Sequence, residues 1–167
     1  MINSKPNVEL LNNDVYVEIS KLGIDYKVIE CDEKYADTHI FCEQYDYPIE
    51  YCANTILLSS KKPPDYYVAC VLQGHKKLDV NNKIRKFMNS TKVSFASREE
   101  TTSLTKMKSG GVTIFGLPNL IDIYVDISIM SQPYLILGSG NRQSKIIVKP
   151  DCFKQIPNIK LIEDITK

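Results

Sequence analysis

The sequence lacks the features that would place the chain in or across a membrane. None of its apolar runs approaches the roughly 18–20 residues that a membrane-spanning helix needs. The opening stretch, MINSKPNVELLNNDVY, contains neither the apolar core nor the cleavage site of a secretory signal. We therefore expect a soluble, cytoplasmic protein.

Several catalytic and metal-binding motifs are also missing. The five cysteines form no CxxC pair and their number is odd, so we expect reduced thiols rather than a disulfide framework. There is no GxSxG elbow, no Walker loop and no dinucleotide-binding fingerprint. His39 with Cys42, and Cys70 with His75, have spacings that could hold zinc, but buried cysteines are more often packing residues. From the residues alone, we therefore favour packing cysteines over a zinc site.

Charge, by contrast, is present but unevenly distributed. The net charge is +1, yet residues 1–60 carry 4 basic and 11 acidic side chains, whereas residues 61–110 carry 11 basic and 4 acidic ones. A segment this basic could meet phosphates on one face of the molecule. Alternatively, the acidic and basic parts could neutralise each other within the fold, and the sequence leaves both possibilities open.

The hydrophobic pattern mixes helices and strands without a regular βαβ alternation. We expect helices at 12–22, ended by Gly23, and at 35–47, 78–89, 97–104 and 150–156. We expect strands at 25–31, 52–60, 66–73, 121–126, 134–138, 145–149 and 159–164. This mixture predicts an α+β fold with a curved or barrel-like sheet flanked by helices. A chain of this length favours one domain over 1–167, with 1–18 as an N-terminal extension and the start of the first helix.

Some elements carry more specific expectations. The 52–60 and 66–73 strands should form an antiparallel hairpin around a turn at 61–65. The SREE stretch that begins at Ser97 has the spacing of a helix capping box. Helical spacing predicts these inward-facing residues: Ile40, Phe41, Val80, Ile84, Phe87 and Met88.

Two glycine-rich loops are the strongest candidates for a binding site. The first is SGGVTIFGLP at 109–118, and the second is GSGNR at 138–142, directly after an apolar strand. Glycines cluster where the backbone needs positive φ or a close approach, and exposed N–H groups in such loops can hold an anion. Arg142 could add bidentate recognition of a phosphate or carboxylate. Asp126, at the end of a strand, is either a site residue or a helix cap, and we favour the cap.

Taken in order along the chain, these segments resemble the YbaK / prolyl-tRNA synthetase-associated editing domain family. The resemblance runs from about residue 19 to the C-terminus and is carried by LGIDYKVIEC, ADTHIFCEQYDYP, CANTILL, VACVLQGHKKLDVNNKIRKFM, GGVTIFGLP, VDISIM and LILGSGNRQSKIIVKP. It implies a YbaK-like mixed, barrel-like β-sheet flanked by helices, with no cofactor. The activity it implies is hydrolysis of the ester between a wrongly attached amino acid and the 3′ end of a tRNA.

The resemblance also implies which residues form the site. The catalytic loop would be Gly110, Gly111, Thr113 and Gly116, whose backbone N–H groups would stabilise the oxyanion while water or a group of the substrate attacks. The substrate-binding residues would be Asn54, Thr55, Asp126, Gly138, Ser139, Gly140, Asn141 and Arg142. The tRNA would contact Lys76, Lys77, Lys83, Arg85 and Lys86.

Two positions depart from the family pattern. The lysine that holds the tRNA end aligns with Asn54, although the following Thr55 is retained, and the proline of the loop aligns with Ile114. One hypothesis is a trans-editing deacylase for a small amino acid, with Arg142 or a lysine of 76–86 replacing the lost charge. The other is a non-catalytic module of the same fold that binds tRNA ends or an aminoacyl-tRNA synthetase. A small-molecule hydrolase would leave the basic segment unexplained.

Overall fold

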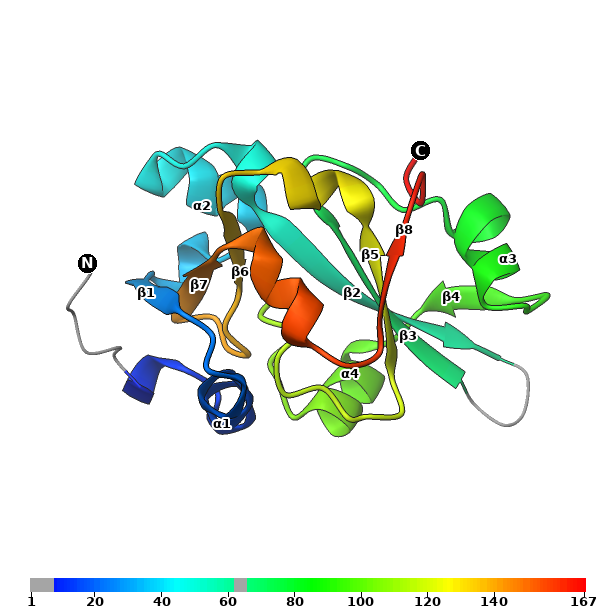
Figure 1. Cartoon of the computed structure of the whole chain (residues 1–167), viewed down its shortest axis with the longest axis horizontal. Helices are drawn as coiled ribbons and strands as arrows, with labels where there is room; N and C mark the ends of the chain where they lie inside the picture. Colours follow the sequence, from blue (N-terminus) through cyan, green and yellow to red (C-terminus); the bar gives the residue numbers. More distant parts are fainter. Residues whose placement is uncertain (1–7, 62–65) are drawn as a thin grey trace.

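The computed structural model describes residues 8–61 and 66–167, in which two β-sheets meet at one point (Figure 1). The first sheet has the order β1-β7-β6 and is antiparallel: β1 (Tyr26–Glu30), β7 (Ser144–Val148) and β6 (Leu135–Gly138). The second has the order β4-β2-β3-β5-β8: β4 (Val93–Phe95), β2 (Ala53–Ser60), β3 (Tyr66–Gln73), β5 (Asp122–Asp126) and β8 (Ile159–Ile162).

The second sheet is mixed, because β5 runs parallel to both β3 and β8 while β2 is antiparallel to β3 and β4. A parallel bridge between Cys52, the residue before β2, and Ile136 of β6 links the two sheets. The predicted α+β class, with a mixed sheet flanked by helices, is confirmed. In place of one continuous curved sheet, the protein has two sheets, which meet at this bridge and separate beyond it.

Two of the helices show the predicted signals at one end: Gly23 ends α1, and a capping box begins α4. In α1 (Asn13–Leu22), the Asn12 side chain accepts hydrogen bonds from the first-turn amides, and Gly23 ends the helix at φ 64°. In α4 (Arg98–Thr105), Ser97 and Glu100 form both halves of the capping box. The short 3₁₀ turns are Val8–Leu10, Glu33–Tyr35, Ile49–Tyr51, Ile127–Ser131 and Pro150–Gln155. Among the described residues, no helix is both long and apolar enough to cross a membrane.

β3 is buried on both faces and so divides the core. Ala69 and Val71 pack with α1 in the larger cluster, whereas Val68, Cys70 and Leu72 pack on the opposite face with the segment after the hairpin. The predicted antiparallel β2–β3 hairpin is confirmed, with Ala53 opposite Gln73 and Ser60 opposite Tyr66. Most of its expected turn, residues 62–65, lies outside the described residues. The five cysteines are buried free thiols.

Two predictions about inward-facing residues are wrong. In α2 (Thr38–Tyr45), Phe41 is fully buried but Ile40 is 42% exposed, because the buried face of this short helix runs through Phe41 and Cys42. The expected 78–89 helix is instead a π-helical turn at Val80–Ile84 followed by α3 (Arg85–Phe87). The wider π turn changes the helical phase, so Phe87 is 48% exposed and its ring lies edge-on to Tyr124.

Candidate active site

A cavity of about 410 Å³ opens where the two sheets separate. β4 pairs with β2 only from Leu58 onward, so the first half of β2 leaves one edge free beside β6. The cavity is lined on one side by β2 and on the other by Leu137 and Gly138 of β6. Ser109, Gly110 and Val112 of the first glycine loop and the start of α2 also line it, together with Phe95, Ala96 and Thr101. Both glycine-rich segments therefore reach one cavity, as the sequence predicts.

The two glycine loops lie in direct backbone contact. The Gly140 N–H donates a 2.7 Å hydrogen bond to the Gly111 carbonyl, and the Lys108 N–H donates one of 3.0 Å to the Gly140 carbonyl. A Cβ at Gly138 would lie 2.6 Å from the carbonyl oxygens of Gly111 and Val112. A Cβ at Gly111 would collide with the backbone of Asn141. These glycines are thus required for close approach of two backbones.

The residues predicted to form the catalytic loop have different surroundings. Gly110 and Val112 line the cavity, and their amides donate no hydrogen bond to any described part of the chain. The Gly111 N–H is used within the loop, where it donates to the Lys108 carbonyl at 2.9 Å. The Gly116 N–H donates to the Glu18 carboxylate, at the α1 side of the loop. Thr113 is fully buried, and its hydroxyl has no partner within 8–61 and 66–167.

On β2, Asn54 and Thr55 both line the cavity. The Thr38 hydroxyl donates a 2.6 Å hydrogen bond to the Asn54 amide oxygen. With the amide oriented by this bond, its NH₂ group makes no hydrogen bond to a described residue. The Thr55 hydroxyl is likewise buried without a partner in the described structure. The Asn54 NH₂ group is therefore available to a ligand, whereas the Thr55 hydroxyl is enclosed by protein.

Arg142, predicted to bind substrate, already has protein partners. Its guanidinium donates to the Asp37 carboxylate at 3.0 Å and to the Glu33 carbonyl at 3.1 Å. It lies so close to Gly110 that a side chain there would collide with it. Arg142 thus ties the second glycine loop to the start of α2, and its charge is largely balanced by Asp37.

The other predicted substrate-binding residues mainly support the loops. The fully buried Ser139 donates to the Ser144 carbonyl at 2.9 Å. Asn141 donates to the Leu10 carbonyl, and Gly140 packs against α1. Asp126 accepts a 2.9 Å hydrogen bond from the Ser128 N–H, so its predicted role as a helix cap is confirmed.

Sequence reasoning missed Lys145, which also lines the cavity. Lys145 lies opposite Gly138 in the β6–β7 ladder and is only 8% exposed. Its ammonium lies 5.1 Å from the centroid of the Phe41 ring, and burial lowers its pKa. The pattern predicts a strand over 145–149, with this lysine as its first residue. The strand begins one residue earlier, at Ser144, and Phe41 of α2 covers the lysine side chain.

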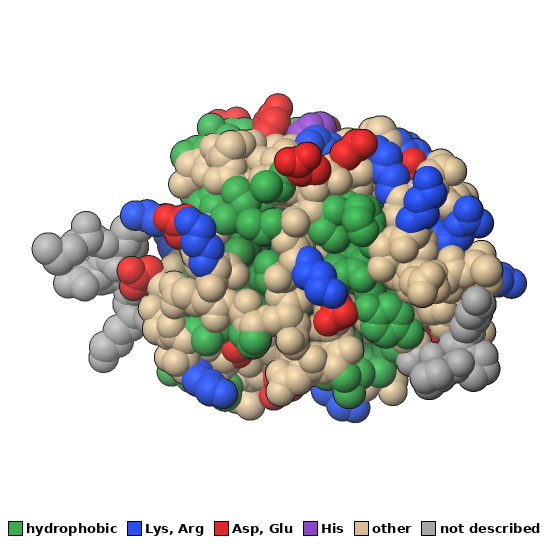
Figure 2. Space-filling view, turned by 45° about the vertical axis from the view of Figure 1, so that its right-hand side comes forward, with side chains coloured by type: hydrophobic (Ala, Val, Ile, Leu, Met, Phe, Trp, Pro, Cys, Tyr) green, Lys and Arg blue, Asp and Glu red, His purple; other side chains and the backbone are tan. Residues whose placement is uncertain are grey.

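The predicted tRNA-binding side chains are not gathered at the cavity. Lys76 donates to the Ser128 hydroxyl at 2.8 Å, and Lys83 donates to Asp164 and to the Thr166 carbonyl. Lys77, Arg85 and Lys86 are exposed. α3 lies at the opposite end of the molecule from β1 and β7 (Figure 1), and Figure 2 shows Lys and Arg side chains gathering at that end. The basic segment is therefore an exposed surface rather than part of the cavity wall.

The chain belongs to the aminoacyl-tRNA editing domain family, whose model matches residues 33–156. The solved structure of a hypothetical protein, APE2540, is similar at a TM-score of 0.81 and 18% identity, covering 93% of this chain and 100% of that one. A proposed trans-editing enzyme for prolyl-tRNA synthetase is similar at a TM-score of 0.78 and 16% identity, covering 94% and 98%. At 18% and 16% identity, these two similarities establish the fold of the chain and nothing about its activity. No curated protein matches the chain significantly. The predicted family and its fold are confirmed.

Proposed function

We propose that the protein is a trans-editing deacylase that hydrolyses the ester between a mischarged small amino acid and tRNA, acting in the cytoplasm. The observation that carries this proposal is the pair of unpartnered amides, Gly110 and Val112, on the wall of the cavity within the described structure. Preorganised backbone N–H groups of this kind stabilise the charge that develops on a carbonyl oxygen during ester hydrolysis. Membership of the editing family supplies the substrate class.

The size and polarity of the cavity fit this substrate. A volume of about 410 Å³ lies near the lower end of ligand pockets, which suits a small amino acid beside a terminal ribose. In this proposal the NH₂ group of Asn54, which has no hydrogen-bond partner in the described structure, binds a ribose or phosphate oxygen, and Thr55 lies next to it on β2. These groups would hold the ester against the glycine loop, and such positioning contributes much of the rate in reactions of this kind.

The nucleophile in this proposal is water or a group of the substrate itself. Among the described lining residues, no serine or cysteine is hydrogen-bonded to a histidine. The Cys52 thiol is a poor nucleophile, because burial raises its pKa far above the ordinary value. Water that attacks the ester carbonyl breaks the bond to the ribose oxygen, which takes up a proton, and the products are the free amino acid and uncharged tRNA. Where a group of the substrate attacks first, water must then hydrolyse the acyl bond that this group has formed.

Asn54 supports a second candidate, a non-catalytic module that binds tRNA ends or a synthetase, because the family's lysine is absent there. A panel of mischarged tRNAs incubated with the wild type and with Asn54→Lys separates the two functions. Release of amino acid by the wild type supports the deacylase. Release only by Asn54→Lys supports the binding module. Asn54→Ala, which removes the free NH₂ group, should slow release by an active wild type.

A further inference from the structure

The cavity contains a single charge that the described protein leaves unbalanced. Three of the described lining residues can carry charge: Asp37, His39 and Lys145. Asp37 is paired with Arg142 at 3.0 Å, and His39 is exposed at the second position of α2. The ammonium of Lys145 has neither an ion pair nor a hydrogen bond within the described structure.

The surroundings of Lys145 contain no carboxylate, among the described residues, that would explain a buried cation. The titratable groups that act on it most are the thiols of Cys31, Cys42 and Cys52 and the guanidinium of Arg142. Burial raises the pKa values of the three thiols and so keeps them protonated. The ammonium lies against the Phe41 ring, and a cation–π interaction compensates only part of the cost of burying it.

We infer that Lys145 binds an anionic oxygen of the substrate, either the phosphate next to the terminal ribose or the side-chain carboxylate of an acidic amino acid. The inference rests on the proposed function, because that function supplies the phosphate with every tRNA and the carboxylate whenever the attached amino acid is acidic. Lys145 projects from β7 into the same cavity that Asn54 lines from β2, so the cation would enter the site from the other sheet. A charge-assisted hydrogen bond from a desolvated ammonium is stronger than one from a neutral amide.

Two matched ligand pairs test this inference without any bond being broken. Adenosine 5′-monophosphate and adenosine differ by the phosphate. Adenosines carrying aspartate or asparagine through a stable 3′-amide differ by one carboxylate. Calorimetry should show that the wild type prefers the anionic member of one pair and that Lys145→Met lowers this preference about ten-fold or more. The ligand pair whose preference falls in Lys145→Met shows whether the lysine binds the phosphate or the carboxylate.

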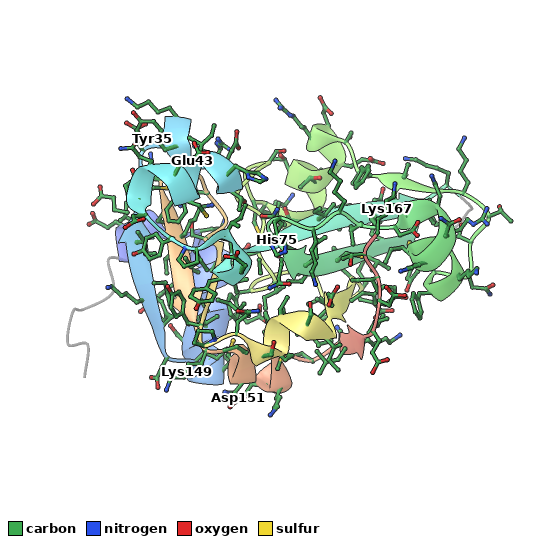
Figure 3. The ribbon with its side chains drawn as sticks, turned by 90° about the horizontal axis from the view of Figure 1, so that it is seen from above. Tyr35, Glu43, His75, Lys149, Asp151 and Lys167 are labelled. Atoms are coloured by element: carbon green, nitrogen blue, oxygen red, sulfur yellow. The ribbon has the colours of Figure 1, made fainter. Side chains whose placement is uncertain are left out.

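Lys149→Met is the matched control, because this lysine follows the same strand but is exposed. Figure 3 shows Lys149 at the margin of the molecule, far from the α2 residue Glu43. The control should leave both preferences unchanged. Adding Asn54→Lys to Lys145→Met should restore the lost preference, since both positions line one cavity. Failure to restore it would count against a shared site.

Thermal unfolding separates ligand binding from a structural role. If the lysine is kept for its ligand, Lys145→Met should unfold at a higher temperature than the wild type, because the variant no longer buries an unbalanced charge. Unchanged preferences for both anionic ligands in Lys145→Met would overturn the inference, whatever the change in melting temperature. A wild type that shows these preferences but releases no amino acid from any tRNA would refute the deacylase and leave the inference standing.

Discussion

The hydroxyl of Thr38, at the first position of α2, donates a 2.6 Å hydrogen bond to the amide oxygen of Asn54 on β2. This bond joins a helix to the edge of the sheet at the cavity wall. It also decides which end of the Asn54 amide is free, since the oxygen is occupied and the NH₂ group is not. Asn54 is therefore oriented as a hydrogen-bond donor toward the ligand.

Replacing Thr38 with valine should weaken catalysis while leaving the fold intact. Valine keeps the shape but removes the donor, so Asn54 loses its fixed orientation. One neutral hydrogen bond of this kind corresponds to about a two- to ten-fold loss in kcat/KM. Steady-state kinetics of deacylation measure this change in kcat/KM. The control is Thr102→Val, which removes a hydroxyl from the exposed face of α4. Equal kcat/KM values for Thr38→Val and wild type would contradict a role of Asn54 in binding the substrate.

Gly138→Ala should disrupt the packing between the two glycine loops. The added Cβ would lie 2.6 Å from two carbonyl oxygens of the first loop, so that loop must move. We expect a loss of about 1–3 kcal/mol in the free energy of unfolding and a loss of deacylation. Gly23→Ala is the control, because its cost of about 1 kcal/mol comes from positive φ alone, far from the cavity. Full activity in Gly138→Ala would show that loop packing does not form the site.

The exposed basic end should contribute to tRNA binding but not to chemistry. Arg85→Ala with Lys86→Ala should reduce the slope of log affinity against log salt by about 1 for each phosphate that the variant no longer neutralises. Hydrolysis of a short aminoacyl-adenosine should be unchanged, because α3 lies outside the cavity. Lys21→Ala with Lys27→Ala, at the opposite end, is the control. The same slope for this pair and for the α3 pair would remove α3 from the interface.

Buried thiols should make the protein less stable at alkaline pH. Burial raises the pKa of Cys70 to about 12, from an ordinary value of 9.0. Between these values the unfolded chain releases this proton and the folded chain keeps it, so stability falls as pH rises, by about 1.4 kcal/mol per pH unit for each thiol. Urea unfolding at pH 9 to 11 should show a shallower decline for Cys70→Ala. If the free energies of unfolding of wild type and Cys70→Ala fell equally with pH, the raised pKa of the Cys70 thiol would be contradicted.

Local signals in the sequence are sufficient for much of the fold. The Gly23 stop of α1, the capping box of α4 and the alternation of the β2–β3 hairpin depend on residues close together in the chain, and these predictions are confirmed. The phase change at the π turn and the outward position of Ile40 depend on tertiary packing, which local spacing does not encode.

The site is predictable only in part for the same reason. Glycine clusters predict the two loops, because close backbone approach excludes side chains. The partners of Arg142 come from the start of α2, more than a hundred residues earlier, so its engagement by Asp37 could not be predicted from the sequence. Lys145 escapes prediction because it is covered by Phe41 of α2, more than a hundred residues earlier in the chain, and local spacing does not encode this contact.

The most direct test of the deacylase proposal is release of amino acid from a panel of tRNAs, each charged with a small non-cognate amino acid. The proposal predicts that catalytic amounts of wild-type protein discharge at least one of them, with the rate reduced in Thr38→Val. No discharge of any tRNA by folded wild-type protein would contradict it.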